Sequence, residues 1–283
     1  MLILGAIIGG GVSSVTKIGL VQIPPFIFSF IRFFIASLVL LPFLRSEKIP
    51  KGKDLLILIG VSILPVSNVA LFVVGVKLTT ASIAVMLYAA TPILTALFCA
   101  YFISHKMGIK KWFYILIGLI GVLLVILMPF FEKGIPFTGD FTGNILISTG
   151  VILWSLYLTY SKKLQKIYSP LIITSFFIFQ AALVFFFLSL TEINSLNYWW
   201  HNITLSSILS LLYITIPATV LAYLMGQHNI KLVGPVEASL THFLMPISGY
   251  LFAFFLLGER LTTGLIIGTI LIFTSIWLTL YKA

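Results

Sequence analysis

The chain is a succession of apolar stretches, each about twenty residues long, divided by short polar segments that carry most of the charges. Within a stretch the apolar residues follow one another continuously, which favours membrane-spanning helices over the alternating strands of a barrel. A helix needs about 20 apolar residues to cross the hydrocarbon layer. We therefore predict an all-α integral membrane protein with ten transmembrane helices, over residues 2–20, 26–44, 55–76, 81–103, 112–130, 144–161, 170–190, 204–227, 234–257 and 264–281.

The composition agrees with this pattern. Of the 283 residues, 60% are hydrophobic and 8% are charged, whereas a soluble domain carries about 25% charged residues. Most of the surface must therefore face lipid. The net charge of +10 does not indicate nucleic acid binding, because the basic residues lie in short loops beside the apolar stretches. The single cysteine, Cys99, excludes a disulfide framework and a multi-cysteine metal site.

The positions of the basic residues predict the orientation in the membrane. Twelve of the 17 lysines and arginines fall on the side of the amino terminus, at 45–53, 106–111, 162–166, 231 and 282. Only Lys17, Lys77, Lys133 and Arg260 fall on the other side, and Arg32 lies within a span. By the positive-inside rule, both termini are predicted to be cytoplasmic in a multi-pass cell membrane protein.

An internal repeat divides the chain into two halves. A shift of 154 residues aligns 77–98 with 231–252 at seven identical positions, which include Pro92 with Pro246. Each half then holds five predicted helices, an odd number, so the second half must enter the membrane upside down. Inverted repeats of this kind are typical of secondary transporters, which give alternating access to a site near the membrane midplane. We predict repeats over 1–131 and 144–283, joined by a loop at 132–143.

The second half carries motifs that resemble the EamA type of the drug/metabolite transporter superfamily. They are GPVEAS at 234–239, Met245-Pro246, LGERLT at 257–262 and Gly268; the first half is similar over 9–17, at Arg32-Phe33 and over 81–92. One departure is His105-Lys106, where the family usually repeats Glu-Arg. The resemblance covers essentially the whole chain. It implies a ten-helix bundle of inverted repeats in a bacterial or archaeal inner membrane, which exports or exchanges small metabolites.

Polar groups deep within the spans are candidate substrate ligands, because a charge at the centre of a membrane helix costs about 2.5 to 3.5 kcal/mol. His242 lies seven residues past Pro235, roughly 10 Å into its span. It either binds substrate or a proton, or it caps a carbonyl that a nearby proline frees. Both interpretations are open. Tyr88 occupies the equivalent position in the first repeat and is also a candidate ligand.

Three charged residues are candidates for coupling or gating. Glu237 stands in the first turn of its helix, where an acid stabilises the helix dipole, or else it faces the cavity as a carboxylate for proton coupling. Arg32, about 10 Å from the outer end of its helix, either snorkels or binds backbone carbonyls, or else it has a coupling or gating role. Lys17, near the outer end of the first helix, either reaches water or has a gating or anion-binding role.

Aromatic and amide side chains complete the candidate substrate site. Trp154 and Tyr157 are three residues apart, and Tyr223 and Gln227 are four apart, so each pair shares one face of a helix. These faces either pack in the core or line the pathway. Two further candidate ligands lie near prolines: Asn68 and Thr91.

Four prolines are predicted to interrupt helices. They occur in corresponding helices of the two halves, and interrupted helices mark the binding site in many transporters. These predicted breaks are Pro65, Pro92, Pro217 and Pro246.

The favoured function is a secondary transporter of small metabolites. No metal cluster, nucleophile with its base, ion filter or Walker loop occurs in the sequence, so enzyme, channel and ATP-driven pump are disfavoured, and no cofactor or metal is expected. The candidate site is aromatic and poor in acid, which favours amino acids or related neutral or zwitterionic solutes. The alternative is efflux of cationic drugs, which would need Glu237. Proton coupling is left open, and the duplicated bundle is large enough to act as a monomer.

Overall fold

The computed structural model describes residues 2–47, 49–103, 107–133, 140–195, 201, 203–257 and 263–281, and this part of the chain is helical without strands. His105-Lys106, the LGERLT motif from residue 258 on, and positions 134–139 of the predicted loop lie outside the described residues. The first half contains α1 (Leu2–Gly10), α2 (Val12–Gly19), α3 (Pro25–Leu40), η1 (Leu41–Ser46), α4 (Lys53–Leu78), α5 (Ala81–Tyr88), α6 (Thr91–Phe102) and α7 (Ile109–Lys133).

The second half begins with long helices and continues in shorter pieces. Its elements are α8 (Phe141–Leu164), α9 (Pro170–Ser189), η2 (Leu190–Ser195), α11 (Leu205–Thr215), the π-helical η4 (Ile216–Leu221), α12 (Ala222–Val233), α13 (Pro235–Ser239), α14 (Thr241–Leu257) and α15 (Thr263–Tyr281).

Seven helical segments among the described residues are long and apolar enough to cross a membrane. They are Leu2–Gly19, Pro25–Arg45, Lys53–Leu78, Ile83–Phe102, Phe141–Leu164, Pro170–Glu192 and Leu205–Val233, and Ile266–Leu280 is a shorter apolar helix. The distribution of side chains fits a lipid environment, since large apolar groups such as Phe113, Leu212 and Ile270 face outward while Arg32 and His242 are buried. The chain is therefore a membrane protein with several spans.

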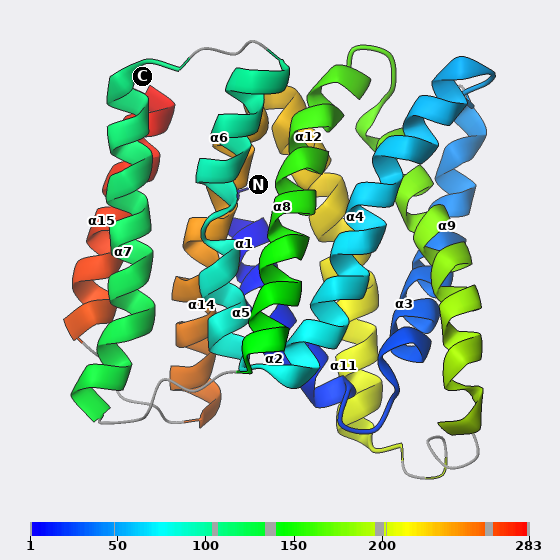
Figure 1. Cartoon of the computed structure of the whole chain (residues 1–283), viewed down its shortest axis with the longest axis horizontal. Coiled ribbons are helices and arrows are strands. Elements are labelled where there is room, and N and C mark those ends of the chain that lie inside the picture. The colour runs from blue at the N-terminus through cyan, green and yellow to red at the C-terminus, as the bar shows by residue number, and fades with distance from the viewer. Residues whose placement is uncertain are drawn as a thin grey trace.

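The helices run side by side across the bundle, and α8 stands near its centre (Figure 1). Three neighbouring pairs make the most extensive contacts: α4 with α8, α3 with α9, and α7 with α15. The labels of both chain ends lie in the upper half of Figure 1. The connections from α3 to α4 and from α8 to α9, which include or adjoin basic residues, lie at the upper end of the bundle.

Glycines allow the closest helix pairs to approach. A Cβ at Gly268 of α15 would lie 2.4 Å from the carbonyl oxygen of Gly121 in α7, which is far inside contact distance. A Cβ at Gly143 of α8 would lie 2.9 Å from the carbonyl oxygen of Gly75 in α4. Small residues at such crossings let backbones pack tightly, which is how helices associate in a bilayer.

Polar side chains cap several helix ends. Asp140 accepts from the backbone N–H of Gly143 at 2.7 Å at the start of α8, and Ser169 accepts from Ile172 N–H at 3.2 Å at the start of α9. Glu192 accepts from the N–H groups of Phe26 and Ile27, each at 3.0 Å, and so caps α3 from a distant segment. These bonds satisfy donors that a helix leaves unpaired at its first turn.

The helix interruptions only partly follow the prolines. Pro92 stands in the first turn of α6, directly after the break at Ala89-Ala90, and Pro217 stands in the π-helical turn η4. Pro65 and Pro246, in contrast, lie inside α4 and α14, which continue through them. The expectation of breaks at these two prolines is therefore wrong, because a membrane helix can lose one backbone hydrogen bond and still be held by its neighbours. The second-half break lies earlier, at Leu240 between α13 and α14.

Candidate functional site

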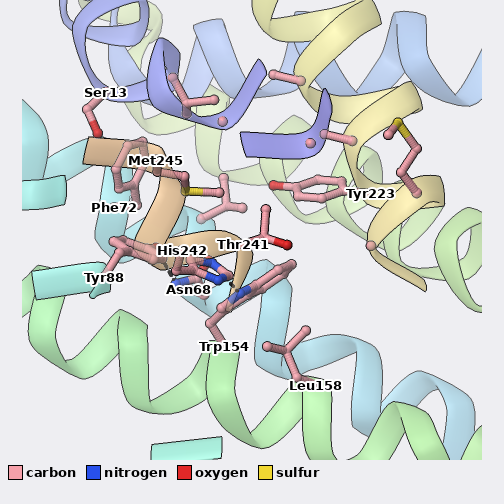
Figure 2. Close-up of a pocket in the computed structure, with 18 of the residues that line it drawn as sticks. Ser13, Asn68, Phe72, Tyr88, Trp154, Leu158, Tyr223, Thr241, His242 and Met245 are labelled. Atoms are coloured by element: carbon pink, nitrogen blue, oxygen red, sulfur yellow. Dashed lines mark hydrogen bonds between the residues drawn. The ribbon is translucent and has the colours of Figure 1, made fainter. Parts of the chain in front are cut away.

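A cavity of about 150 Å³ opens between helices of both halves. Its wall is formed by α1, α2, α3, α4, α5, α8, α12, α13, α14 and the π-helical turn η4, so residues far apart in the sequence meet there. A cavity of this volume holds a ring the size of benzene. Figure 2 shows its labelled wall residues, with Tyr223 on one side and the group of His242, Trp154, Asn68 and Tyr88 on the other.

His242 is fixed on the cavity wall by hydrogen bonds at both ring nitrogens. Its Nδ1 lies 3.0 Å from the carbonyl oxygen of Ser239, and its Nε2 lies 3.1 Å from the indole Nε1 of Trp154. A carbonyl can only accept and an indole N–H can only donate. The ring is therefore neutral, with its proton on Nδ1. Ser239 ends α13, so the imidazole satisfies a carbonyl that the break before α14 leaves free.

Tyr88 and Asn68 extend this group toward α4 and α5. The Tyr88 ring stacks on the His242 ring with centroids 6.1 Å apart and planes within 10°. The amide nitrogen of Asn68 donates to the Tyr88 hydroxyl at 2.6 Å and to the carbonyl of Gly150 at 2.8 Å. Figure 2 shows the three side chains close together. The network ties α4, α5, α8 and α14 to one another at the cavity.

Further aromatic rings pack around Tyr223 and Trp154 at the cavity. The Tyr223 ring lies 5.7 Å from Trp154 and 5.0 Å from Phe177, centroid to centroid. Tyr157 packs behind Trp154 at 5.4 Å and is not among the residues that line the cavity. The wall thus combines several rings with aliphatic side chains and a few polar groups, which is typical of small-molecule sites.

Arg32 also lines the cavity, although only 2% of its surface is exposed. Its Nε–H donates to the Thr219 hydroxyl at 2.5 Å and its Nη2 donates to the Tyr223 hydroxyl at 3.1 Å. The guanidinium carbon lies 4.8 Å from the ring centroid of Phe33. Among the residues that the structure describes, no carboxylate contacts it.

Besides Tyr157, two more of the predicted ligands lie away from the cavity. Gln227 is buried against α8, where its amide nitrogen donates to the Ser161 hydroxyl at 3.0 Å and its amide oxygen accepts from Gln165 at 2.8 Å. Thr91 is fully buried, and its hydroxyl has no hydrogen-bond partner within the described part of the chain. Neither residue lines the cavity. The four-residue spacing on α12 therefore wrongly predicted that Gln227 faces the cavity with Tyr223.

Glu237 and Lys17 also lie outside the cavity lining. The Glu237 carboxylate pairs with the ammonium of Lys111 at 2.6 Å, and both side chains are largely buried. Lys17 donates to the carbonyl of Thr79 at 2.5 Å, at the carboxyl end of α4, where a cation stabilises the helix dipole. Both residues therefore join helices to one another.

The sequence did not predict several other residues that line the cavity. They include Ser13, Thr241 and Met245, which Figure 2 labels, and Met225, Gly226 and Asn229 of α12. On α12 the signal is the spacing of Ala222, Met225, Gly226 and Asn229, which places them on one face. Gln227 follows Gly226 directly and lies on the neighbouring face of α12. It was predicted in place of the lining residues because its side chain is more polar.

In the part of the chain that the structure describes, several apolar helical spans surround an internal cavity that carries polar groups, an architecture suited to a membrane transport protein. The family comparison is specific. The model of the EamA-like transporter family matches residues 1–127 and 141–281, and the chain belongs to this family, which indicates a transporter and not an enzyme.

Relatives agree with the assignment. The chain is 29% identical over 257 residues to an "Uncharacterized transporter" of Clostridium kluyveri, which covers 88% of this chain and 81% of the relative. It is 26% identical to "Uncharacterized transporter YdfC" of Bacillus subtilis, over 89% of this chain and 80% of the relative. "Uncharacterized inner membrane transporter YedA" of Escherichia coli K12 is 32% identical over 56% of this chain and 51% of its own length.

A solved structure shares the fold. A crystal structure with only 15% sequence identity covers 100% of this chain and 96% of its own, with a TM-score of 0.76. At that identity the likeness concerns the fold alone.

Proposed function

We propose that this protein is a secondary transporter that moves small neutral or zwitterionic metabolites, such as amino acids, by alternating access, as an exporter or exchanger. The observation that carries the proposal is the cavity. The polar and aromatic groups of its wall are rings, two amides, a neutral imidazole and the guanidinium of Arg32, and no aspartate or glutamate is among its described lining residues. We assign solute contact to Tyr88, Trp154, Tyr223, His242 and Asn68 on this basis.

Export of hydrophobic cations is less well supported. A cation in a low-dielectric cavity needs a carboxylate to replace its water. Glu237 was the one candidate, and its carboxylate is already paired with Lys111 away from the cavity lining. The charge pattern of the wall therefore favours a solute without net positive charge.

We also propose that the chain crosses the membrane ten times as two inverted five-helix repeats. In this arrangement α1–α2 corresponds to α8, α3 to α9, α4 to α11–α12, α5–α6 to α13–α14, and α7 to α15. The helix contacts support it, because they keep their pattern when the halves are exchanged. The contacts of α8 with α4 and α6 correspond to those of α1–α2 with α11–α12 and α14, while α3–α9 and α7–α15 pair with their own counterparts.

Interrupted helices in corresponding positions give further support. The first half is interrupted between α5 and α6, and the second between α13 and α14. These interruptions bring Tyr88 and His242, equivalent residues in the two repeats, into stacking contact at the cavity. A site formed where two broken helices face each other is the arrangement expected for alternating access.

The test is uptake by proteoliposomes that contain the purified protein. A panel of labelled amino acids and nucleobases is supplied with and without a pH gradient. We expect accumulation of one solute class, at least tenfold weaker in His242→Ala and unchanged in His228→Ala, because His228 lies exposed on α12. Absence of transport for every solute, or equal behaviour of the two histidine variants, would overturn the proposal.

A further inference from the structure

Arg32 holds a full positive charge in the interior of the bundle. It is the eighth residue of α3, roughly 10 Å along the helix from its start. The residue is 2% exposed, and its side-chain nitrogens donate to Thr219 and Tyr223 of the facing helix segment. The charged head is therefore held at the cavity and does not reach the membrane surface.

The hydrogen bonds of Arg32 leave part of the guanidinium without a partner. Of its five N–H groups, one on Nε and one on Nη2 donate to hydroxyls. The remaining three, two on Nη1 and one on Nη2, have no protein partner in the described part of the chain. The hydroxyls are neutral and the nearby rings of Phe33 and Tyr223 carry no charge. Neither neutralises the cation.

The partners of Arg32 hold its head in one orientation. Thr219 stands in the π-helical turn η4, and its hydroxyl donates to the carbonyl of Ile214, five residues earlier, at 2.7 Å. Its oxygen therefore accepts from Arg32 in a fixed direction. The ring of Tyr223, which supplies the second acceptor, is packed between Trp154 and Phe177. The guanidinium is thus preorganised, with two neighbouring nitrogens, Nη1 and Nη2, left to bind a ligand.

A buried cation without a counter-ion is unfavourable, so a ligand with a negatively charged group would bind favourably because it supplies the missing counter-ion. A carboxylate matches the planar fork of a guanidinium with two parallel hydrogen bonds. Resting on the function proposed above, we infer that Arg32 binds a carboxylate of the transported solute, so that organic carboxylates, zwitterionic amino acids included, are carried and amines or nucleobases are not.

A second polar side chain is placed to meet the rest of such a solute. Asn229 lines the cavity, is 6% exposed and has no hydrogen-bond partner among the described residues. It follows Tyr223 by six residues on α12, about 9 Å along the helix. A carboxylate at Arg32 therefore leaves the other end of a small solute near an amide that can donate or accept. The end of the solute beside Asn229 is therefore expected to be polar, and its charge is not specified.

The experiment compares matched solutes on the purified protein. The probes are leucine, its amide, the corresponding amine, the corresponding acid without the amino group, and inorganic phosphate, with the same series for phenylalanine. Two quantities are measured for each probe: the thermal stabilisation of the protein, and the competition of the probe with uptake of a labelled amino acid. The proteins are wild type, Arg32→Gln, Arg32→Lys and Arg45→Gln. Arg45 is an exposed arginine just beyond α3 and serves as the matched control.

We expect stabilisation and competition only from probes with a carboxylate, at least a tenfold loss of affinity in Arg32→Gln, a smaller loss in Arg32→Lys, and no change in Arg45→Gln. Should Arg32→Gln fail to fold, the wild-type series and Tyr223→Phe still decide, because removal of that hydroxyl keeps the charge and must keep the preference for carboxylates. Transport of the amine or amide as fast as of the amino acid, or binding of phosphate alone, overturns the inference but leaves the transporter. Failure of every solute to move overturns the proposed function instead.

Discussion

The hydrogen bonds of His242 define its state more closely than its depth in the membrane does. The Trp154 indole donates to Nε2, and Nδ1–H donates to the carbonyl of Ser239, so the ring is neutral and both nitrogens are occupied. A second proton, on Nε2, would oppose the indole N–H. The residue thus serves as a structural link between α8 and the α13–α14 break and as part of the cavity wall.

This link predicts a measurable coupling between the two side chains. Trp154→Phe should lower the stability of the protein by about 1 kcal/mol through loss of the hydrogen bond, and the same change in a His242→Phe background should cost less. Melting can be followed with a thiol-reactive dye, because the single cysteine, Cys99, is fully buried in the fold. Strictly additive effects of the two substitutions would show that the bond does not contribute.

The Glu237–Lys111 ion pair joins α13 to the first turn of α7. Glu237→Gln should destabilise the protein, since it leaves a largely buried ammonium unpaired, and Lys111→Gln added to it should restore part of the loss. Solute selectivity should stay that of the wild type. Loss of cation transport in Glu237→Gln, with amino-acid transport intact, would favour the drug-efflux alternative and contradict our assignment.

For single residues, the sequence predicts well which polar residues lie deep in a membrane helix, but poorly which way their side chains face. His242, Tyr88, Trp154, Asn68, Tyr223 and Arg32 all line the cavity. They could be found because a polar group deep in an apolar helix has few reasons to be there. Gln227 and Asn229 lie two residues apart on α12, however, and only tertiary packing determines which of them faces the cavity.

Among the elements, the α7–α15 pair depends on the absence of side chains. The carbonyl of Gly121 occupies the place of a Cβ on Gly268, and backbone cannot move aside as a side-chain tip can. Gly264, four residues before Gly268 on α15, also faces α7, so small residues recur along this crossing.

A glycine comparison tests the importance of this crossing. Gly268→Ala should lower the melting temperature markedly, whereas Gly60→Ala should be neutral or stabilising by up to about 1 kcal/mol, because Gly60 has open space around its Cβ position and alanine is the better helix former. The melting temperatures of both variants can be measured with the thiol-reactive dye, which reacts with Cys99 as the protein unfolds. Equal effects of the two substitutions would show that the α7–α15 packing is not tight.

Most helix ends could be predicted within a few residues because continuous apolar runs and capping residues define them, although α12 continues to Val233, past the end predicted at 227. The helix interruptions could not. Pro65 and Pro246 are accommodated inside α4 and α14, while the break before α14 falls at Leu240, where no proline stands. The local sequence shows where a hydrogen bond is lost, but the neighbouring helices decide whether the helix bends, continues or ends.

For the whole molecule, the inverted repeat predicts which ends of the helices share a side of the membrane. In a Cys99→Ala background, cysteines at Arg45 and Lys163 should react with an impermeant maleimide only from the cytoplasmic side. Cysteines at Val21, just after α2, and at Thr204, directly before α11, should react only from outside, because these helix ends lie at the lower end of the bundle in Figure 1. Reaction of all four from one side, or of the first pair from outside, would contradict the proposed topology.

The central claim is that the solute passes through the cavity formed by both halves. Gly226 lines this cavity and a Cβ there would meet no atom within 4 Å, so a side chain can start at this position and extend toward the space that the solute would use. Gly60 of α4 has the same open surroundings outside the cavity lining and gives the matched control.

The most direct measurement is solute counterflow in proteoliposomes with Gly226→Leu beside Gly60→Leu. Our account predicts that Gly226→Leu folds and melts like the wild type but exchanges solute at least tenfold more slowly, while Gly60→Leu exchanges at the wild-type rate. Wild-type exchange by Gly226→Leu would show that the solute does not use this cavity.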